Sequence, residues 1–180
     1  RGRVIKMWNI ISGFDTLITD YSYNSQDQVT DYSHTGKGEK ISYRNSYDYA
    51  GRLSSADKYD IPDIPNPDFI NLAAYSYNPN SQVSQNDLNE GNIRIYYYYN
   101  NRGWISEMLE NNGFLNYTNG YFKNGNVKSQ QISGDYNDNF SVSTDLAYTY
   151  TYDKSNRLLT SDNADKIYDL TNSYDKDGNI

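Results

Sequence analysis

The sequence predicts an all-β protein in which antiparallel β-hairpin repeats form one extended, curved sheet. At seven places in the 180 residues, a tyrosine is followed four residues later by a turn-forming residue and six residues later by Val, Leu or Ile. The position four residues after each of these tyrosines holds Gly, Asn, Asp or Ser, which favour turns. Tyrosine occurs 21 times and often alternates with small polar residues, as in antiparallel sheets with a solvated face.

Each copy of this motif predicts one hairpin. The tyrosine ends a strand, an Asp or Asn that follows it in six of the seven copies begins the turn, and the aliphatic residue begins the returning strand. The fourth position after the tyrosine is expected to have a positive φ. The seven copies are Tyr23–Val29, Tyr47–Leu53, Tyr77–Val83, Tyr99–Ile105, Tyr121–Val127, Tyr152–Leu158 and Tyr174–Ile180.

The spacing of the copies predicts a single repeat array over residues 1–180 with two insertions. Two of the six intervals between motif tyrosines are long, and we expect inserted loops near residues 57–68 and 134–145. The first insertion carries three prolines, which do not fit a central strand. The opening residues Arg1-Gly2-Arg3-Val4 match the end of a further copy, so we expect the chain to be a segment excised from a longer array.

Further tyrosines lie two residues before four of the motif tyrosines. Because side chains two residues apart on a strand share a face, one face of each hairpin is expected to be aromatic. These additional tyrosines are Tyr21, Tyr75, Tyr97 and Tyr150.

Composition narrows the classes of function. The formal net charge is −7, which opposes binding to nucleic acid. The chain has no cysteine and one histidine, so disulfides, Cys/His metal centres and thiol nucleophiles are excluded. The apolar runs are too short to span a bilayer. We therefore expect a structural or binding protein that is not an enzyme, with no cofactor and no catalytic or metal-ligating residues.

The segment Tyr47-Asp48-Tyr49-Ala50-Gly51-Arg52-Leu53 resembles the YD-repeat signature of the Rhs family, Tyr-Asp-x-x-Gly-Arg-Leu. Residues 152–158 repeat it with Asn in place of Gly, and residues 174–180 keep the Tyr, Asp and Gly. The other copies are looser, with Gln, Trp or Asn at the arginine position, and together the copies cover nearly the whole chain.

This resemblance implies a long β-sheet that winds into a hollow shell around a toxin polypeptide. Such shells occur in bacterial Rhs toxins, in the C components of insecticidal Tc complexes and, more distantly, in animal teneurins. The chain would then be a secreted or cell-surface bacterial protein whose partners are the rest of the parent shell and its cargo. It contains neither a self-cleavage segment nor a variable toxic domain, so the resemblance implies a piece of wall.

A carbohydrate-binding surface module is the alternative function. The run of four tyrosines at residues 96–99 and Trp104 after the turn offer rings that could stack on sugars, and the candidate glycan-stacking residues are Tyr97, Tyr99 and Trp104. Packing within the sheet is the favoured interpretation of these rings. A hydrolase with paired carboxylates is a third hypothesis, for which the sequence identifies no pair. An isolated fragment could also associate with itself through its sheet edges.

Other polar motifs are better explained as ordinary loops. His34 lies in a glycine-containing stretch without the spacing of a phosphate-binding loop, which predicts a surface turn. Asp135, Asn137 and Asn139 alternate as calcium ligands do, but the Gly and the Glu that such a loop needs are absent. Two matches to the N-glycosylation pattern, at Asn116 and Asn139, are interpreted as coincidence.

Overall fold

The computed structural model describes residues 2–10, 12, 16–59, 69–113, 115–136, 142–143, 146–163 and 169–180. The described residues form strands and turns, and none of them forms a helix long and apolar enough to cross a membrane. The strands are β1 Lys6–Ile10, β2 Thr16–Tyr23, β3 Val29–Gly36, β4 Glu39–Tyr47, β5 Leu53–Tyr59, β6 Ile70–Tyr77, β7 Val83–Leu88, β8 Ile93–Tyr99, β9 Ile105–Glu110, β10 Asn116–Tyr121, β11 Val127–Ser133, β12 Asp135–Tyr136, β13 Val142–Ser143, β14 Leu146–Tyr152, β15 Leu158–Asn163 and β16 Leu170–Thr171.

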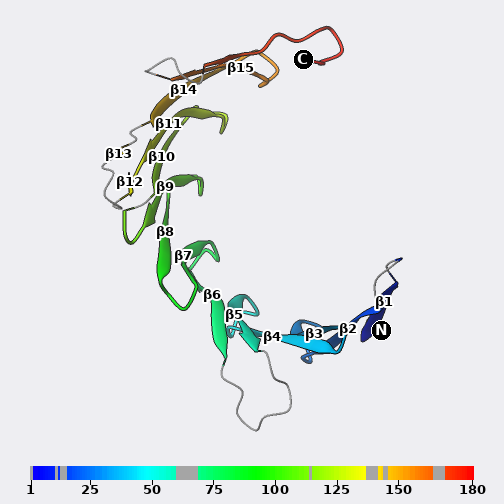
Figure 1. The fold of residues 1–180 in the computed structure, drawn as a ribbon. Helices are drawn as coiled ribbons and strands as arrows, with labels where there is room; N and C mark the ends of the chain where they lie inside the picture. Colours follow the sequence, from blue (N-terminus) through cyan, green and yellow to red (C-terminus); the bar gives the residue numbers. More distant parts are fainter. Residues whose placement is uncertain are drawn as a thin grey trace. The chain divides into compact units, whose positions relative to one another are not determined.

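Fourteen of these strands form an antiparallel sheet in which the strands follow one another in chain order, with β14 next to β11 (Figure 1). The short strands β12 and β13 pair with each other in a separate two-stranded sheet. The chain divides into two compact units, Arg1–Arg94 and Ile95–Ile180. Successive strands within each unit are rotated relative to one another, so each unit by itself is a curved piece of sheet (Figure 1). The predicted fold class is confirmed.

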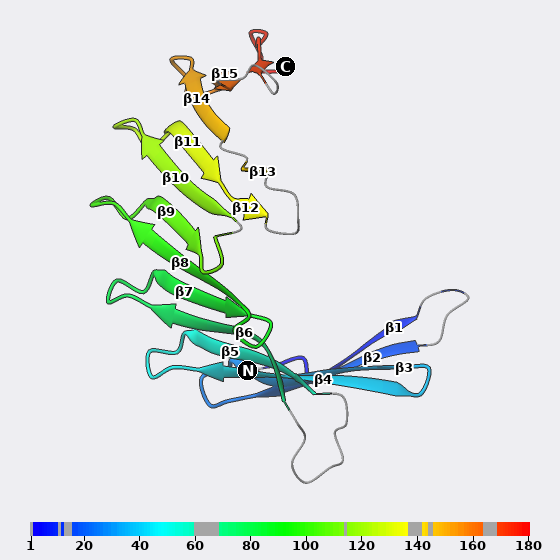
Figure 2. The ribbon, with the colours of Figure 1, turned by 60° about the vertical axis from the view of Figure 1, so that its left-hand side comes forward.

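The motif tyrosines and aliphatic residues mark strand ends as predicted. In six copies the tyrosine is the last residue of one strand and the aliphatic residue is the first of the next. Each of these pairs follows a register shift, for example between Ser46 and Tyr47, so that Tyr47 lies opposite Leu53. Such a shift is a β-bulge, and it lets a type I turn join two strands. Figure 2 shows two of these turns, after β8 and β10, on the same side of the second unit.

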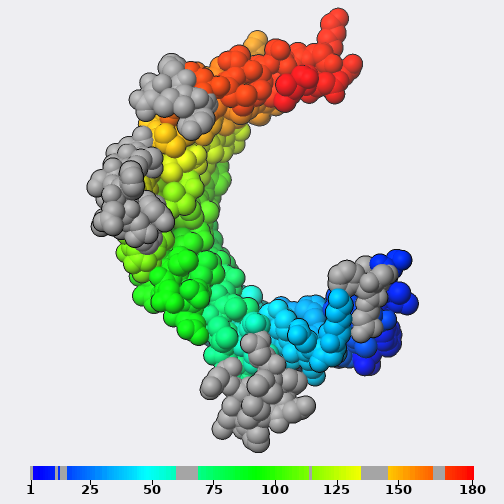
Figure 3. All heavy atoms as spheres, viewed as in Figure 1, coloured from blue at the N-terminus to red at the C-terminus, as the bar shows by residue number. Residues whose placement is uncertain are grey.

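The described part of the chain has almost no hydrophobic core. Ala73 is its one buried hydrophobic residue, and the side chains with less than 2 % exposure are the small polar residues Thr19, Ser42 and Asn163. This burial pattern is that of a single layer with solvent on both faces. In Figure 3 the second unit appears as successive bands of colour, one hairpin after another. Because the sheet has so little hydrophobic core, its stability must come from contacts between neighbouring strands and turns.

The predicted surface turn at His34 is wrong. His34 lies in β3, and its ring meets the stacked rings of Tyr32 and Tyr43 edge-on, at centroid distances of 5.7 and 6.0 Å. Its Nδ1 lies 3.0 Å from the Thr19 hydroxyl. The connection to β4 is a two-residue turn, Lys37-Gly38, with φ of 52° and 81°. A turn in which both residues have positive φ needs no further residues, so the strand continues through His34 to Gly36.

Parts of the two predicted insertions belong to strands. Residues 57–59 are the end of β5, and residues 60–68 lie outside the described residues. In the second insertion, Asp135 and Tyr136 pair with Ser143 and Val142. Residues 137–141 and 144–145 lie outside the described residues, and with them Asn137 and Asn139 of the calcium-like pattern. Asn116 of the other glycosylation pattern begins β10.

Candidate functional site

The turn that closes each hairpin is the most regular chemical feature of the molecule. All seven residues at the fourth position after the motif tyrosine have positive φ, between 63° and 97°. Four are glycines and three carry side chains: Asp27, Ser81 and Asn156. The left-handed conformation predicted from turn-forming residue types is therefore present in every copy.

The Asp or Asn after the tyrosine holds the turn together. In Asp48, for example, Oδ1 accepts hydrogen bonds from the backbone N–H groups of Ala50 and Arg52, both at 2.9 Å. The Oδ1 atoms of Asn24, Asn78, Asn100, Asp153 and Asp175 accept the equivalent two hydrogen bonds from backbone N–H groups, at 2.8–3.1 Å.

These hydrogen bonds stabilise the ionised form of the turn carboxylates. The hydrogen bond from the Arg52 side chain is the largest cause of a pKa below the usual range for Asp48. For Asp153 the largest cause of its lowered pKa is the backbone N–H of Arg157, and for Asp175 it is the Asn179 side chain. The carboxylates of Asp48, Asp153 and Asp175 are therefore stabilised in the ionised form, in which they act as the hydrogen-bond acceptors of their turns.

The motif tyrosine joins its own hairpin to the preceding one. The Tyr77 hydroxyl donates a 2.7 Å hydrogen bond to the carbonyl of Leu53, the aliphatic residue of the copy before it. We call this bond the tyrosine clasp. Among the described residues, clasps of this kind, at 2.6–2.8 Å, include Tyr23–Val4, Tyr47–Val29, Tyr77–Leu53, Tyr121–Ile105 and Tyr174–Leu158.

The residue five positions after the tyrosine makes a second link, to the following hairpin. We call it the bridging residue. The guanidinium groups of Arg52 and Arg157 each lie 4.4 Å over the ring of the next motif tyrosine, Tyr77 and Tyr174. Gln28, at the same position, donates a 2.6 Å hydrogen bond to the Gly51 carbonyl in the next turn.

Trp104 is also a bridging residue. It occupies the arginine position of its copy, and its indole lies 5.2 Å from the ring of Tyr121, the next motif tyrosine. It packs so closely on the following turn that a Cβ built on Gly125 would lie 3.1 Å from Cζ2 of the indole. This role was not predicted from the sequence, although Trp104 occupies the same repeat position as Arg52 and Arg157.

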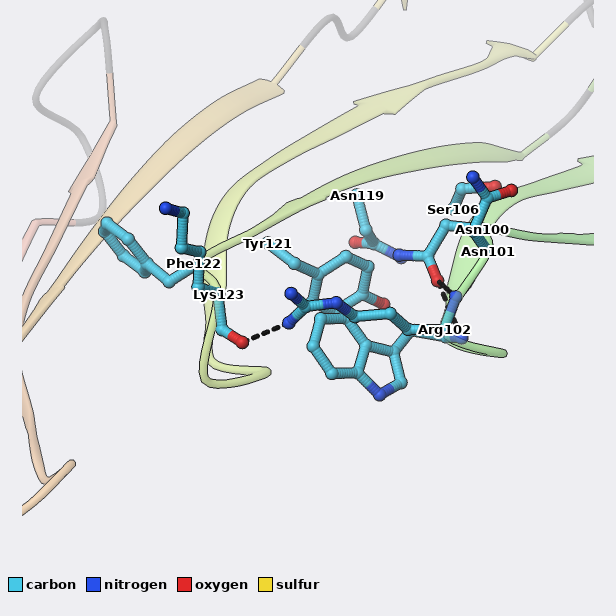
Figure 4. A pocket seen from close by; sticks show the side chains of 9 residues that line it. Asn100, Asn101, Arg102, Ser106, Asn119, Tyr121, Phe122 and Lys123 are labelled. Atoms are coloured by element: carbon cyan, nitrogen blue, oxygen red, sulfur yellow. Dashed lines mark hydrogen bonds between the residues drawn. The ribbon is translucent and has the colours of Figure 1, made fainter.

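Trp104 also lines a cavity of about 480 Å³ in the second unit. The guanidinium of Arg102 lies 5.2 Å over its ring, and Nη1 donates to the carbonyl of Lys123 (Figure 4). The lining contains no carboxylate; its members are Asn100, Asn101, Arg102, Trp104, Ser106, Asn119, Tyr121, Phe122 and Lys123. Of the three candidate glycan-stacking residues, the structure brings Trp104 to this cavity, while Tyr97 and Tyr99 are not among its lining residues.

The fold and its turns define a β-hairpin repeat protein in which neighbouring copies are linked side by side. No protein-family model matches the chain, and no curated protein sequence matches it. Solved structures do match: the TcdB2-TccC3-Cdc42 crystal structure has a TM-score of 0.65 and 16% identity over 82% of this chain and 7% of that chain. A variant of the Photorhabdus luminescens Tc holotoxin pore gives a TM-score of 0.64, 16% identity and the same two coverages.

TcdB2-TccC3 without its hypervariable C-terminal region matches 92% of this chain and 10% of that chain, with a TM-score of 0.57 and 12% identity. At these identities the likeness concerns the fold. The shared fold is a curved antiparallel β-sheet, which is the coarser part of what the YD-repeat resemblance implies, and the chain spans about a tenth or less of the length of these proteins.

Proposed function

We propose that the chain is a wall segment of a YD-repeat shell that encloses or presents a toxin or effector polypeptide located elsewhere in the parent chain. It acts through its architecture and catalyses no reaction. The observation that carries this proposal is the double link between copies, because the tyrosine clasp and the bridging residue extend a sheet one hairpin at a time. The fold similarity to Tc toxin structures supports it.

The thin cross-section of the sheet also supports a role as a wall. With Ala73 as the one buried hydrophobic residue among those described, the sheet has no second layer to cover, and each face is free to meet water or cargo. We further propose that the parent protein works outside the bacterial cell that makes it.

Electron cryomicroscopy of the full-length parent protein tests this proposal. We expect the strands of this segment to continue into a closed shell with density for an enclosed polypeptide. Protease digestion of the same particles should leave that polypeptide intact. A sheet packed against a separate globular domain, or an effector that is cleaved as fast as in its free form, would overturn the proposal.

Glycan binding is a second candidate function, favoured by the cavity beside Trp104. Aromatic rings, three asparagines and the cation Arg102 line it, and such a lining can stack on a sugar ring and bind its hydroxyls. A glycan array is the test. We expect binding that Trp104→Ala abolishes while the circular dichroism spectrum stays unchanged, and an array without signal would contradict this candidate.

A further inference from the structure

A second groove lies between the turn of residues 121–127 and the turn of residues 152–158. Its volume is about 450 Å³. It lies wholly within the second unit, and its lining consists of Phe122, Lys123, Asn124, Asn126, Tyr152, Asp153 and Asn156. The shell role assigns no task to this groove.

In both copies that carry an arginine as bridging residue, its side chain contacts the equivalent tyrosine. Arg52 lies 4.4 Å over Tyr77, and Arg157 lies 4.4 Å over Tyr174. The bridging residue of the copy before Tyr152 is Asn126, whose short side chain reaches Asn156 Oδ1 at 3.2 Å. The groove beside Tyr152 therefore corresponds to the place where an arginine side chain lies in the consensus repeat.

The lining of the groove suits a guanidinium group. Phe122 replaces the usual Asp or Asn of its copy, and its ring meets that of Tyr152 edge to face, at 6.2 Å and 89°. Two perpendicular rings offer faces to a cation. The Asp153 carboxylate lies at the rim, where its Oδ2 is paired with Nε of Arg157 at 2.6 Å, so the rings provide the main contact surface for a cation.

The charge of Lys123 beside the groove and the net charge of the chain indicate which cation and which partner the groove would bind. The Lys123 side chain shares the lining and opposes a compact ammonium more than a delocalised, weakly hydrated guanidinium. The net charge of −7 favours approach of a basic partner. We propose that this groove binds an arginine side chain of a partner polypeptide, with the guanidinium placed against Phe122 and Tyr152 as Arg157 is placed against Tyr174.

Titration with short capped peptides tests the proposal. We expect Gly-Arg-Gly to shift the ring resonances of Tyr152 and Phe122 in NMR spectra with a dissociation constant of about 1 mM. The same peptide with citrulline, which has the shape of arginine without its charge, should bind at least about tenfold more weakly. Equal shifts with citrulline, or no shifts with arginine, would overturn the proposal.

A variant that places the guanidinium inside the groove gives a second readout. Asn126→Arg restores the consensus bridging residue, so we expect it to raise the thermal midpoint and to abolish binding of Gly-Arg-Gly. Gln28→Arg makes the same charge change at the same repeat position in the first unit and should leave peptide binding unaltered. A lower thermal midpoint for Asn126→Arg, or wild-type binding by it, would contradict the assignment of the groove. The shell proposal does not depend on either result.

Discussion

At the scale of single residues, the repeat depends on one backbone conformation. Every copy places a residue with positive φ four positions after its tyrosine, a conformation that costs side-chain-bearing residues about 1 kcal/mol relative to glycine. That a serine and an aspartate also adopt it, at Ser81 and Asp27, indicates that the turn's hydrogen bonds are strong enough to impose it.

The two glycines Gly125 and Gly113 provide a matched test of the contact with Trp104. Both have positive φ, of 97° and 76°, but a Cβ on Gly113 would meet nothing within 4 Å, while one on Gly125 would meet the indole. We expect each substitution by Ala to destabilise the fold, and Gly125→Ala to cost about 1 kcal/mol more than Gly113→Ala. Urea denaturation of the two variants measures the difference. If both variants lost the same free energy of unfolding, the indole of Trp104 would be able to move aside without cost.

The turn carboxylates predict a loss of stability in acid. The pKa values of Asp48, Asp153 and Asp175 are lowered in the folded state. Their contribution is thus fully present above the unfolded pKa, about 3.9, and disappears as pH falls through the lower folded values. Replacing all three by Asn, which keeps the Oδ1 acceptor, should make the urea midpoint nearly independent of pH between pH 5 and pH 2. If the urea midpoint of this variant fell with pH as steeply as that of the wild type, these carboxylates would have no role in acid stability.

At the scale of the hairpin, the sequence is sufficient to locate turns and strand ends but not the links between copies. A tyrosine, an Asx and a glycine lie within seven residues, so local turn chemistry predicts that Tyr47 and Leu53 flank a bend. The tyrosine clasp joins residues such as Tyr77 and Leu53, 24 positions apart. Nothing local specifies that pairing, because it depends on how one hairpin registers against the next.

Local sequence also fails to predict which neighbours individual side chains contact. Alternation alone could not show that Trp104 lies against Tyr121 in the next hairpin, since a ring near a turn can point to either face. The strand position of His34 was missed for a related reason, because two residues with positive φ can close a turn without any Pro or Asn-Gly signal.

The tyrosine clasp gives the clearest mutational prediction at this scale. Tyr77→Phe removes the hydroxyl that donates to the Leu53 carbonyl at 2.7 Å and should destabilise the protein by about 1 kcal/mol. Burial raises the pKa of Tyr77, in keeping with a partly desolvated hydroxyl. Tyr49→Phe is the control, because Tyr49 is 98% exposed in its turn and should change the urea midpoint little. If the two variants behaved alike, the clasp would carry no stability.

At the scale of the whole chain, links between neighbouring copies predict local rather than global coupling. Stability in such an array is a sum of repeat and nearest-neighbour contributions. Tyr77→Phe should therefore speed amide hydrogen exchange in the hairpins of β4–β5 and β6–β7, and leave that of β14–β15 unchanged. Exchange measured by mass spectrometry would reveal this pattern. Uniform acceleration over all strands would indicate one cooperative core instead.

Consecutive hairpins lie side by side, and the bridging residues Arg52, Trp104 and Arg157 each contact the next motif tyrosine. Nuclear Overhauser spectroscopy of the chain tests this arrangement most directly. We predict cross-peaks from the Arg52 side chain to the Tyr77 ring, from Trp104 to Tyr121, and from Arg157 to Tyr174. Cross-peaks confined to residues of the same hairpin, with none to the next turn, would contradict the account.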